Sequence, residues 1–127
     1  MKRIAIIIAG GRDDDFRIKD MSNVLGCINE LMIEHNSNDL TLITGKCSGI
    51  DKKSEEWWRE IINNNVIEKP ANWKEHGKAA GPIRNRKMAR LAATYDYSVV
   101  IGIRGGAGTA GMMKLGKEYC DLTRWFK

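Results

Sequence analysis

The stretch VVIGIRGGAGT, residues 99–109, joins an apolar run to a cluster of glycines. Val99 to Ile103 is β-branched except at Gly102, which is typical of a strand buried on both faces. Glycines after such a strand let the backbone approach a ligand closely, and a helix-compatible stretch follows them here. The first amides of a helix have no partner within the helix and lie at the positive end of its dipole. This order of strand, glycines and helix is therefore typical of a site that holds an anion such as phosphate.

Strands and helices are predicted to alternate along the whole chain. Strands are predicted at residues 4–9, 40–44, 66–68 and 98–103, and helices at residues 21–32, 50–62, 82–93 and 109–120. Such alternation indicates a parallel sheet with right-handed crossovers. The sequence therefore predicts one domain over residues 1–127. We expect an α/β, Rossmann-like three-layer fold whose parallel sheet has about four strands, in the order 3-2-1-4.

Length and composition fit a single globular domain. The chain has 127 residues, is 43% hydrophobic and carries a net charge of +5, which indicates mild attraction to polyanions. Its longest apolar run, residues 4–9, is too short to span a membrane, so no membrane partner is expected. Three widely spaced cysteines favour reduced thiols in a cytoplasmic protein. Neither cysteine nor histidine spacing predicts a metal site.

The loops that follow the predicted strands all lie at one edge of a parallel sheet. In the order 3-2-1-4, strand order reverses between the first and the fourth strand, and ligands bind at such a point in open α/β sheets. This order brings Gly10, Gly11 and Arg12 next to residues 105–108. Residues 106–111 also fit the pattern G-x-G-x-x-G, but they follow the last strand rather than the first. No dinucleotide or other cofactor is therefore predicted; a phosphate loop or a simple tight turn remain as interpretations.

Five segments at this edge carry a resemblance to a known family. They are GGR at residues 10–12, TGKCSGID at 44–51, PANW at 70–73, HGKAAGPIRNR at 76–86 and GGAGT at 105–109. The series resembles the YspA-like proteins (the DUF2493 family) of the SLOG superfamily, found in bacteria and their phages. The resemblance implies a Rossmann-like domain that binds a nucleotide or a nucleotide-derived molecule. It is also compatible with a homodimer, because proteins of this superfamily often form dimers.

The enzyme branch of that superfamily, the LOG-type phosphoribohydrolases, cleaves the N-glycosidic bond of nucleoside 5′-monophosphates. Its motif G-G-x-G-T-x-x-E ends in a catalytic glutamate, and this chain has Met112 at the matching position. A thioether cannot exchange a proton or stabilise an oxocarbenium-like centre. The departure removes the expected catalytic carboxylate and leaves the phosphate-binding part of the motif intact, so no catalytic residue is assigned.

The candidate site residues come from all of these loops. They are Gly10, Gly11, Arg12, Gly45, Ser48, Asp51, His76, Lys78, Arg84, Asn85, Arg86, Gly105, Gly106, Gly108 and Thr109. The last four would hold phosphate, while Arg84 and Arg86, expected in the first turn of their helix, would supply counter-charge.

Each of these assignments has a structural alternative. Arg84 and Arg86 can instead form salt bridges with residues 13–15, and Arg12 can pair with an acid. Ser48, Asp51 and Thr109 can cap helices. His76 is either a general base in catalysis or a histidine of a surface loop. Trp73 either stacks on a nucleobase or packs its loop against the core.

Three functions are compatible with these observations. The first is a module that binds a nucleotide or nucleotide-derived ligand, as a sensor or a sequestering protein. The second is a hydrolase of nucleotide N-glycosidic bonds in which another carboxylate substitutes at Met112. The third, single-stranded nucleic-acid binding, is suggested by Trp73 and the basic residues around it. Those basic residues lie in one loop rather than along a groove, so nucleic acid is not an expected partner.

Overall fold

The structure is a computed structural model that describes residues 1–127, and its centre is the buried strand β1 (Arg3–Gly10). β1 pairs in parallel with β2 (Asp39–Thr44) on one side and with β4 (Tyr97–Ile103) on the other. β3 (Val66–Glu68) and β5 (Leu122–Phe126) form the two edges, so that the strand order is β3-β2-β1-β4-β5. The predicted order 3-2-1-4 is confirmed, and a fifth strand extends it.

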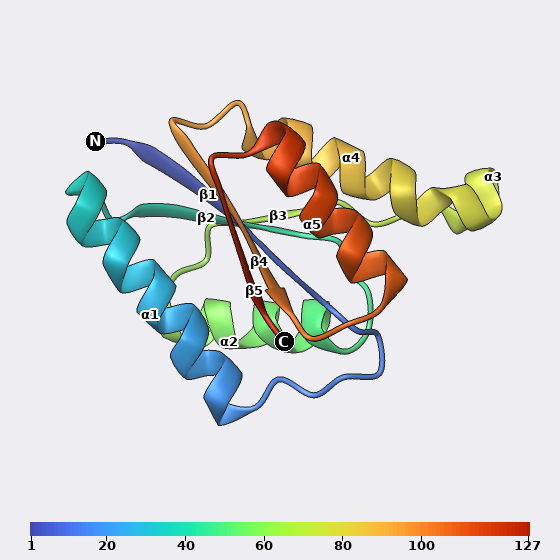
Figure 1. The fold of residues 1–127 in the computed structure, drawn as a ribbon, viewed down its shortest axis with the longest axis horizontal. Helices are drawn as coiled ribbons and strands as arrows, with labels where there is room; N and C mark the ends of the chain where they lie inside the picture. The colour runs from blue at the N-terminus through green and yellow to red at the C-terminus, as the bar shows by residue number, and fades with distance from the viewer.

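Helices cover both faces of the sheet and give three layers (Figure 1). α1 (Ile18–His35) and α2 (Ile50–Ile61) lie on one face, and α4 (Ala80–Ala92) and α5 (Ala107–Tyr119) lie on the other. The short α3 (Trp73–His76) and the 3₁₀ turn η1 (Gly77–Ala79) lead into α4. None of these helices is long and apolar enough to cross a lipid bilayer.

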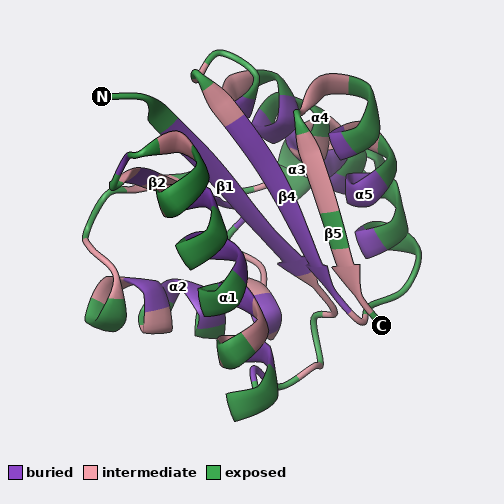
Figure 2. Ribbon diagram, turned by 60° about the vertical axis from the view of Figure 1, so that its left-hand side comes forward, coloured by how far each residue is buried: buried purple, intermediate pink, exposed green.

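Alternation along β1 builds the two halves of the core. Ile4, Ile6 and Ile8 pack into the cluster that contains the buried residues of α1 and α2. Ala5 and Ile7 pack into the cluster of α4 and α5. Figure 2 shows β1 and most of β4 buried beneath the helices, whereas β5 at the edge is only partly buried. This continuous burial is the reason that the apolar runs identified the central strands.

The fifth strand, β5, was not predicted from the sequence. It pairs with β4 from Val99 opposite Leu122 to Ile103 opposite Phe126. Asp121, directly before β5, ties the start of this strand to β4. Its carboxylate accepts hydrogen bonds from the amide and the hydroxyl of Ser98, at 2.9 and 3.1 Å. The strand has only five residues and lies at the sheet edge, so it lacks the apolar run of a buried strand.

Helix starts also differ from the sequence expectation. α1 begins at Ile18 rather than residue 21, and α5 begins at Ala107 rather than residue 109. α4 begins at Ala80, so Arg84, Asn85 and Arg86 lie in its second turn, not in its first. In each case the first turn carries few of the apolar residues from which helical periodicity is recognised, which explains the late predicted starts.

Two glycines in helix interiors provide a test of the packing between α5 and the sheet. A Cβ at Gly116 of α5 would lie 2.8 Å from a methyl carbon of Val100 and 2.9 Å from one of Thr123. A Cβ at Gly26 of α1 would meet nothing within 4 Å. We expect Gly116→Ala to lower the free energy of unfolding by about 1–3 kcal/mol through overpacking. Gly26→Ala should raise it by roughly 0.5–1 kcal/mol, because alanine favours the helix.

Urea unfolding of both variants measures these opposite signs. A Gly116→Ala protein as stable as the wild type would show that α5 does not pack this closely on β4 and β5.

Candidate functional site

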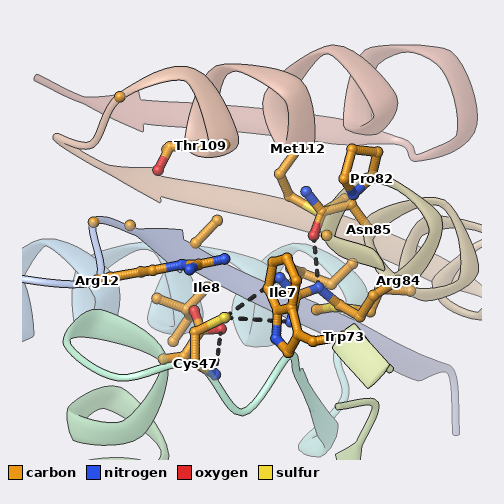
Figure 3. A pocket seen from close by; sticks show the side chains of 18 of the residues that line it. Ile7, Ile8, Arg12, Cys47, Trp73, Pro82, Arg84, Asn85, Thr109 and Met112 are labelled. Carbon is orange, nitrogen blue, oxygen red and sulfur yellow. Dashed lines mark hydrogen bonds between the residues drawn. The ribbon is translucent and has the colours of Figure 1, made fainter. Parts of the chain in front are cut away.

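A cavity of about 360 Å³ opens at the carboxyl end of β1. At this point the chain continues to one face of the sheet after β1 and to the other face after β4. The loop after β1, the loop after β2, the α3–α4 segment and the start of α5 surround it (Figure 3). Its lining residues are Ile7, Ile8, Ala9, Gly10, Gly11, Arg12, Cys47, Asp51, Trp73, Lys78, Gly81, Pro82, Arg84, Asn85, Met88, Gly106, Gly108, Thr109 and Met112. Its volume falls in the range of small-molecule sites in proteins, about 300–1,000 Å³.

The glycine loop after β4 presents the start of α5 to this cavity. Gly105 has a φ of +84°, which favours glycine, and a Cβ there would collide with the side chain of Thr109. Gly106 is the N-cap residue of α5, and no side chain accepts a hydrogen bond from the first-turn amides. Those amides and the helix dipole favour a negative charge in the cavity.

Arg84 is the most buried charged side chain in the wall of the cavity, with 8% of its surface exposed. Its guanidinium donates to the carbonyl oxygen of Gly45 at 2.6 Å and to the side-chain oxygen of Asn85 at 2.9 Å. It also lies 3.4 and 3.5 Å from the sulfur of Cys47. A Cβ at Gly45 would lie 2.4 Å from a guanidinium nitrogen, so this glycine makes room for Arg84. The predicted alternative, a salt bridge from Arg84 to residues 13–15, is wrong.

Two further cations face the cavity. Arg12 and Lys78 line it, and neither forms a salt bridge, nor does Arg84. The Arg12 guanidinium instead lies 4.6 Å from the centroid of the Trp73 ring, in a cation–π contact. Three cationic side chains without a carboxylate partner therefore converge on one cavity.

Asp51 is the one carboxyl group among the lining residues. Burial raises its pKa from 3.8 to about 6, although the Cys47 amide and the nearby Arg84 and Arg12 charges oppose this shift. The Cys47 amide donates to a carboxylate oxygen of Asp51 at 3.2 Å. α2 has Gly49 at its N-cap and no side-chain cap, so neither Ser48 nor Asp51 caps the helix as the alternative interpretation held. Asp51 therefore contributes a carboxyl group to the wall of the cavity.

The structure brings most of the sequence-predicted site residues together. Ten of them line the cavity: Gly10, Gly11, Arg12, Asp51, Lys78, Arg84, Asn85, Gly106, Gly108 and Thr109. Gly45 and Ser48 line a neighbouring cavity that shares Arg12, Cys47 and Trp73 with the first. His76, Arg86 and Gly105 line neither cavity; Arg86 is exposed, and His76 lies 3.7 Å from Glu75.

Sequence reasoning missed several lining residues. Cys47 was part of the TGKCSGID segment but was not selected as a site residue, yet its sulfur contacts Arg84. Met88 was not singled out, and Gly81 and Pro82 were quoted in the HGKAAGPIRNR segment but not selected, because apolar residues of a cavity floor look like core residues in a sequence. The signal for Cys47 was its place between Gly45 and Asp51, two residues already selected.

One partly buried and one exposed ion pair hold the loop after β1 in place. Arg104, at the end of β4, donates to both carboxylate oxygens of Asp20, at 2.8 and 3.1 Å, and to the carbonyl oxygen of Asp15. Burial raises the pKa of Asp20, but the hydrogen bonds from Arg104 and from the Arg17 amide outweigh it and lower that pKa overall. Asp15 pairs with Lys53 at 2.8 Å. Asp15 and Asp20 are thus engaged away from the cavity cations.

Fold and cavity together define a Rossmann-like α/β protein with a cation-lined cavity where strand order reverses. Comparisons of the chain with protein-family models, with curated proteins and with solved structures found no match.

The raised pKa of Asp51 predicts a pH dependence of stability. In the folded protein the carboxyl keeps its proton up to about pH 6, whereas the unfolded chain releases it near 3.8. The free energy of unfolding therefore falls as pH rises from about 4 to 6, and the loss is complete above that range. Asp51→Asn cannot titrate, so its free energy of unfolding lacks this decrease. From pH 4 to pH 7.5 the variant should therefore become more stable relative to the wild type by up to about 3 kcal/mol.

Urea unfolding of both proteins at these two pH values gives the comparison. Parallel pH profiles would contradict a buried, protonated Asp51.

Proposed function

We propose that this protein binds a nucleotide or a nucleotide-derived phosphorylated molecule in the cavity between β1 and β4. The observation that carries the proposal is the presence of Arg12, Lys78 and Arg84, none with a salt bridge, in the same cavity as the uncapped start of α5. Charge-assisted hydrogen bonds from arginine and lysine to phosphate are among the stronger polar contacts in proteins. The resemblance to YspA-like proteins supports the same ligand class. The three free cysteines support a cytoplasmic location.

The lining residues suggest which part of such a ligand contacts each wall of the cavity. Phosphate lies at the amides of Gly106 and Gly108, within reach of Arg12 or Lys78. Asp51, on the opposite wall, accepts hydrogen bonds from ribose hydroxyls. The apolar floor, which includes Met88 and Met112, and the exposed Trp73 ring provide surfaces for a base.

A phosphate-dependent binding experiment tests this function. Isothermal titration with AMP, GMP, CMP and UMP, each against its nucleoside, should show binding only for the phosphorylated member of at least one pair. Arg12→Ala should weaken that binding about tenfold or more, on the scale of ~1.5 kcal/mol for one charged hydrogen bond.

Arg86→Ala is the matched control, because it removes an arginine from the same basic segment but outside the cavity. It should leave the affinity unchanged. Equal losses in both variants, or equal binding of nucleosides and nucleotides, would contradict a phosphate site in this cavity. Affinity that rises with oligonucleotide length and falls steeply with salt would indicate single-stranded nucleic acid instead.

A second candidate function is hydrolysis of the N-glycosidic bond of a nucleoside 5′-monophosphate. The observation that favours it is Asp51, a carboxyl in the same cavity with a pKa near 6, the range in which a general acid works at neutral pH. It would have to replace the glutamate missing at Met112.

Proton NMR of the ribose anomeric signal separates the two candidates. If the protein is a hydrolase, AMP is converted to free ribose 5-phosphate, and Asp51→Asn lowers the rate by about 10² to 10⁴, the typical contribution of general acid–base catalysis. If it only binds, the AMP signals broaden and no ribose 5-phosphate forms over a day. Turnover that survives Asp51→Asn would rule out this carboxyl as the acid.

A further inference from the structure

A second cavity, of about 330 Å³, adjoins the first at the same edge of the sheet. It is lined by Arg12, Gly45, Lys46, Cys47, Ser48, Pro70, Ala71 and Trp73. Three of these residues, Arg12, Cys47 and Trp73, also line the first cavity. The two cavities are therefore neighbouring chambers, and a ligand that passes Arg12 and Trp73 enters both.

The border between the chambers carries a positive charge. Arg12 extends across the opening toward Trp73, as Figure 3 shows, and its guanidinium is 4.6 Å from the ring centroid. Arg12 forms no salt bridge, and it is the one arginine common to both linings. A cation at this border is placed to meet a phosphate that links two parts of one molecule.

The backbone around this border is fixed by contacts between the loops. The Ser48 hydroxyl donates to the carbonyl oxygen of Arg12 at 3.1 Å, and the Ile50 amide donates to that of Gly11 at 3.2 Å. Gly49 has a φ of +71°, and a Cβ there would lie 2.4 Å from both of those carbonyl oxygens. The loops after β1 and β2 are thus docked tightly, and the second chamber is a built feature of the fold.

The second chamber itself offers no free charge beyond Arg12. Its other cation, Lys46, is neutralised by Glu55 at 3.3 Å and by Glu68 at 3.2 Å. No carboxylate belongs to the lining, and the remaining surfaces are small, apolar, hydroxyl-bearing or aromatic. Such a chamber suits a neutral group with hydroxyls and a flat face, a sugar or a second nucleoside, rather than another phosphate.

We infer that the ligand is a two-part molecule: a nucleotide joined through a diphosphate bridge to a second, neutral sugar or nucleoside. This inference rests on the proposed function. The nucleotide occupies the first chamber, the bridge lies at Arg12, and the second group occupies the chamber lined by Ser48, Pro70 and Ala71.

Titration with AMP, ADP and ADP-ribose tests the inference, since these probes add first the second phosphate and then the second sugar. The wild type should bind ADP-ribose at least tenfold more tightly than ADP. Ala71→Trp fills the second chamber, so it should reduce ADP-ribose affinity to that of ADP and change AMP affinity less than twofold. Ala93→Trp is the control, because Ala93 is exposed just beyond the end of α4 and lines neither chamber.

The possible failures are distinguishable. Equal affinities for ADP and ADP-ribose, or an ADP-ribose affinity that Ala71→Trp leaves unchanged, would overturn the two-part ligand while AMP binding upholds the proposed function. Equal losses for AMP and ADP-ribose in Ala71→Trp would show that the chambers do not act separately, and would also overturn it. No binding of any of the three probes would overturn the two-part ligand, whereas the proposed function would be overturned only if GMP, CMP and UMP also failed to bind.

Discussion

The pairing of β1 with β2 on one side and with β4 on the other is the constraint from which the site follows. After β1 the chain turns to α1 on one face of the sheet, and after β4 it turns to α5 on the opposite face. The two connections therefore diverge, and no helix closes the gap between their starting points. An opening at the carboxyl ends of these strands is the geometric consequence, as in other open α/β sheets. The charge of the cavity and its ability to donate or accept protons depend on which side chains border that opening.

The buried charge of Arg84 in this opening is stabilised by uncharged groups rather than by carboxylates. Arg84 is almost fully buried, and a buried charge needs hydrogen-bonding partners to offset its lost hydration. Its partners are a backbone carbonyl, an amide oxygen and a thiol, none of which neutralises it. Asp51 is the nearest compensating group, but burial opposes its ionisation and holds its pKa near 6. The wall thus retains positive charge into the neutral pH range, which favours an anionic ligand over a neutral one.

Sequence reasoning predicted the sheet better than the site. The central strands are recognisable because they are buried on both faces, and the alternation with helices predicts that they are parallel. β5 was missed because an edge strand of five residues has no such pattern. Arg12 was found at the cavity because it lies in the loop after β1, and Thr109 because it ends the glycine segment after β4. Arg86 was selected with Arg84, although it lies two residues along the helix and is exposed outside the cavity. Cys47 and Met88 became part of the site only through folding, since their role depends on contacts across long stretches of chain.

The position of Met112 determines from which side any chemistry in the cavity can proceed. Met112 is 2% exposed, packs with Met88 and Met113 in the core and contributes an apolar surface to the floor on the α5 side. A proton therefore cannot come from that wall. The one carboxyl group of the lining, Asp51, belongs to α2, which lies on the other face of the sheet. A bound nucleotide with its phosphate at the start of α5 would meet an apolar surface on one side and a protonatable group on the other. In the proposed binding mode, phosphate and sugar would contact opposite walls, and any acid catalysis would depend on Asp51.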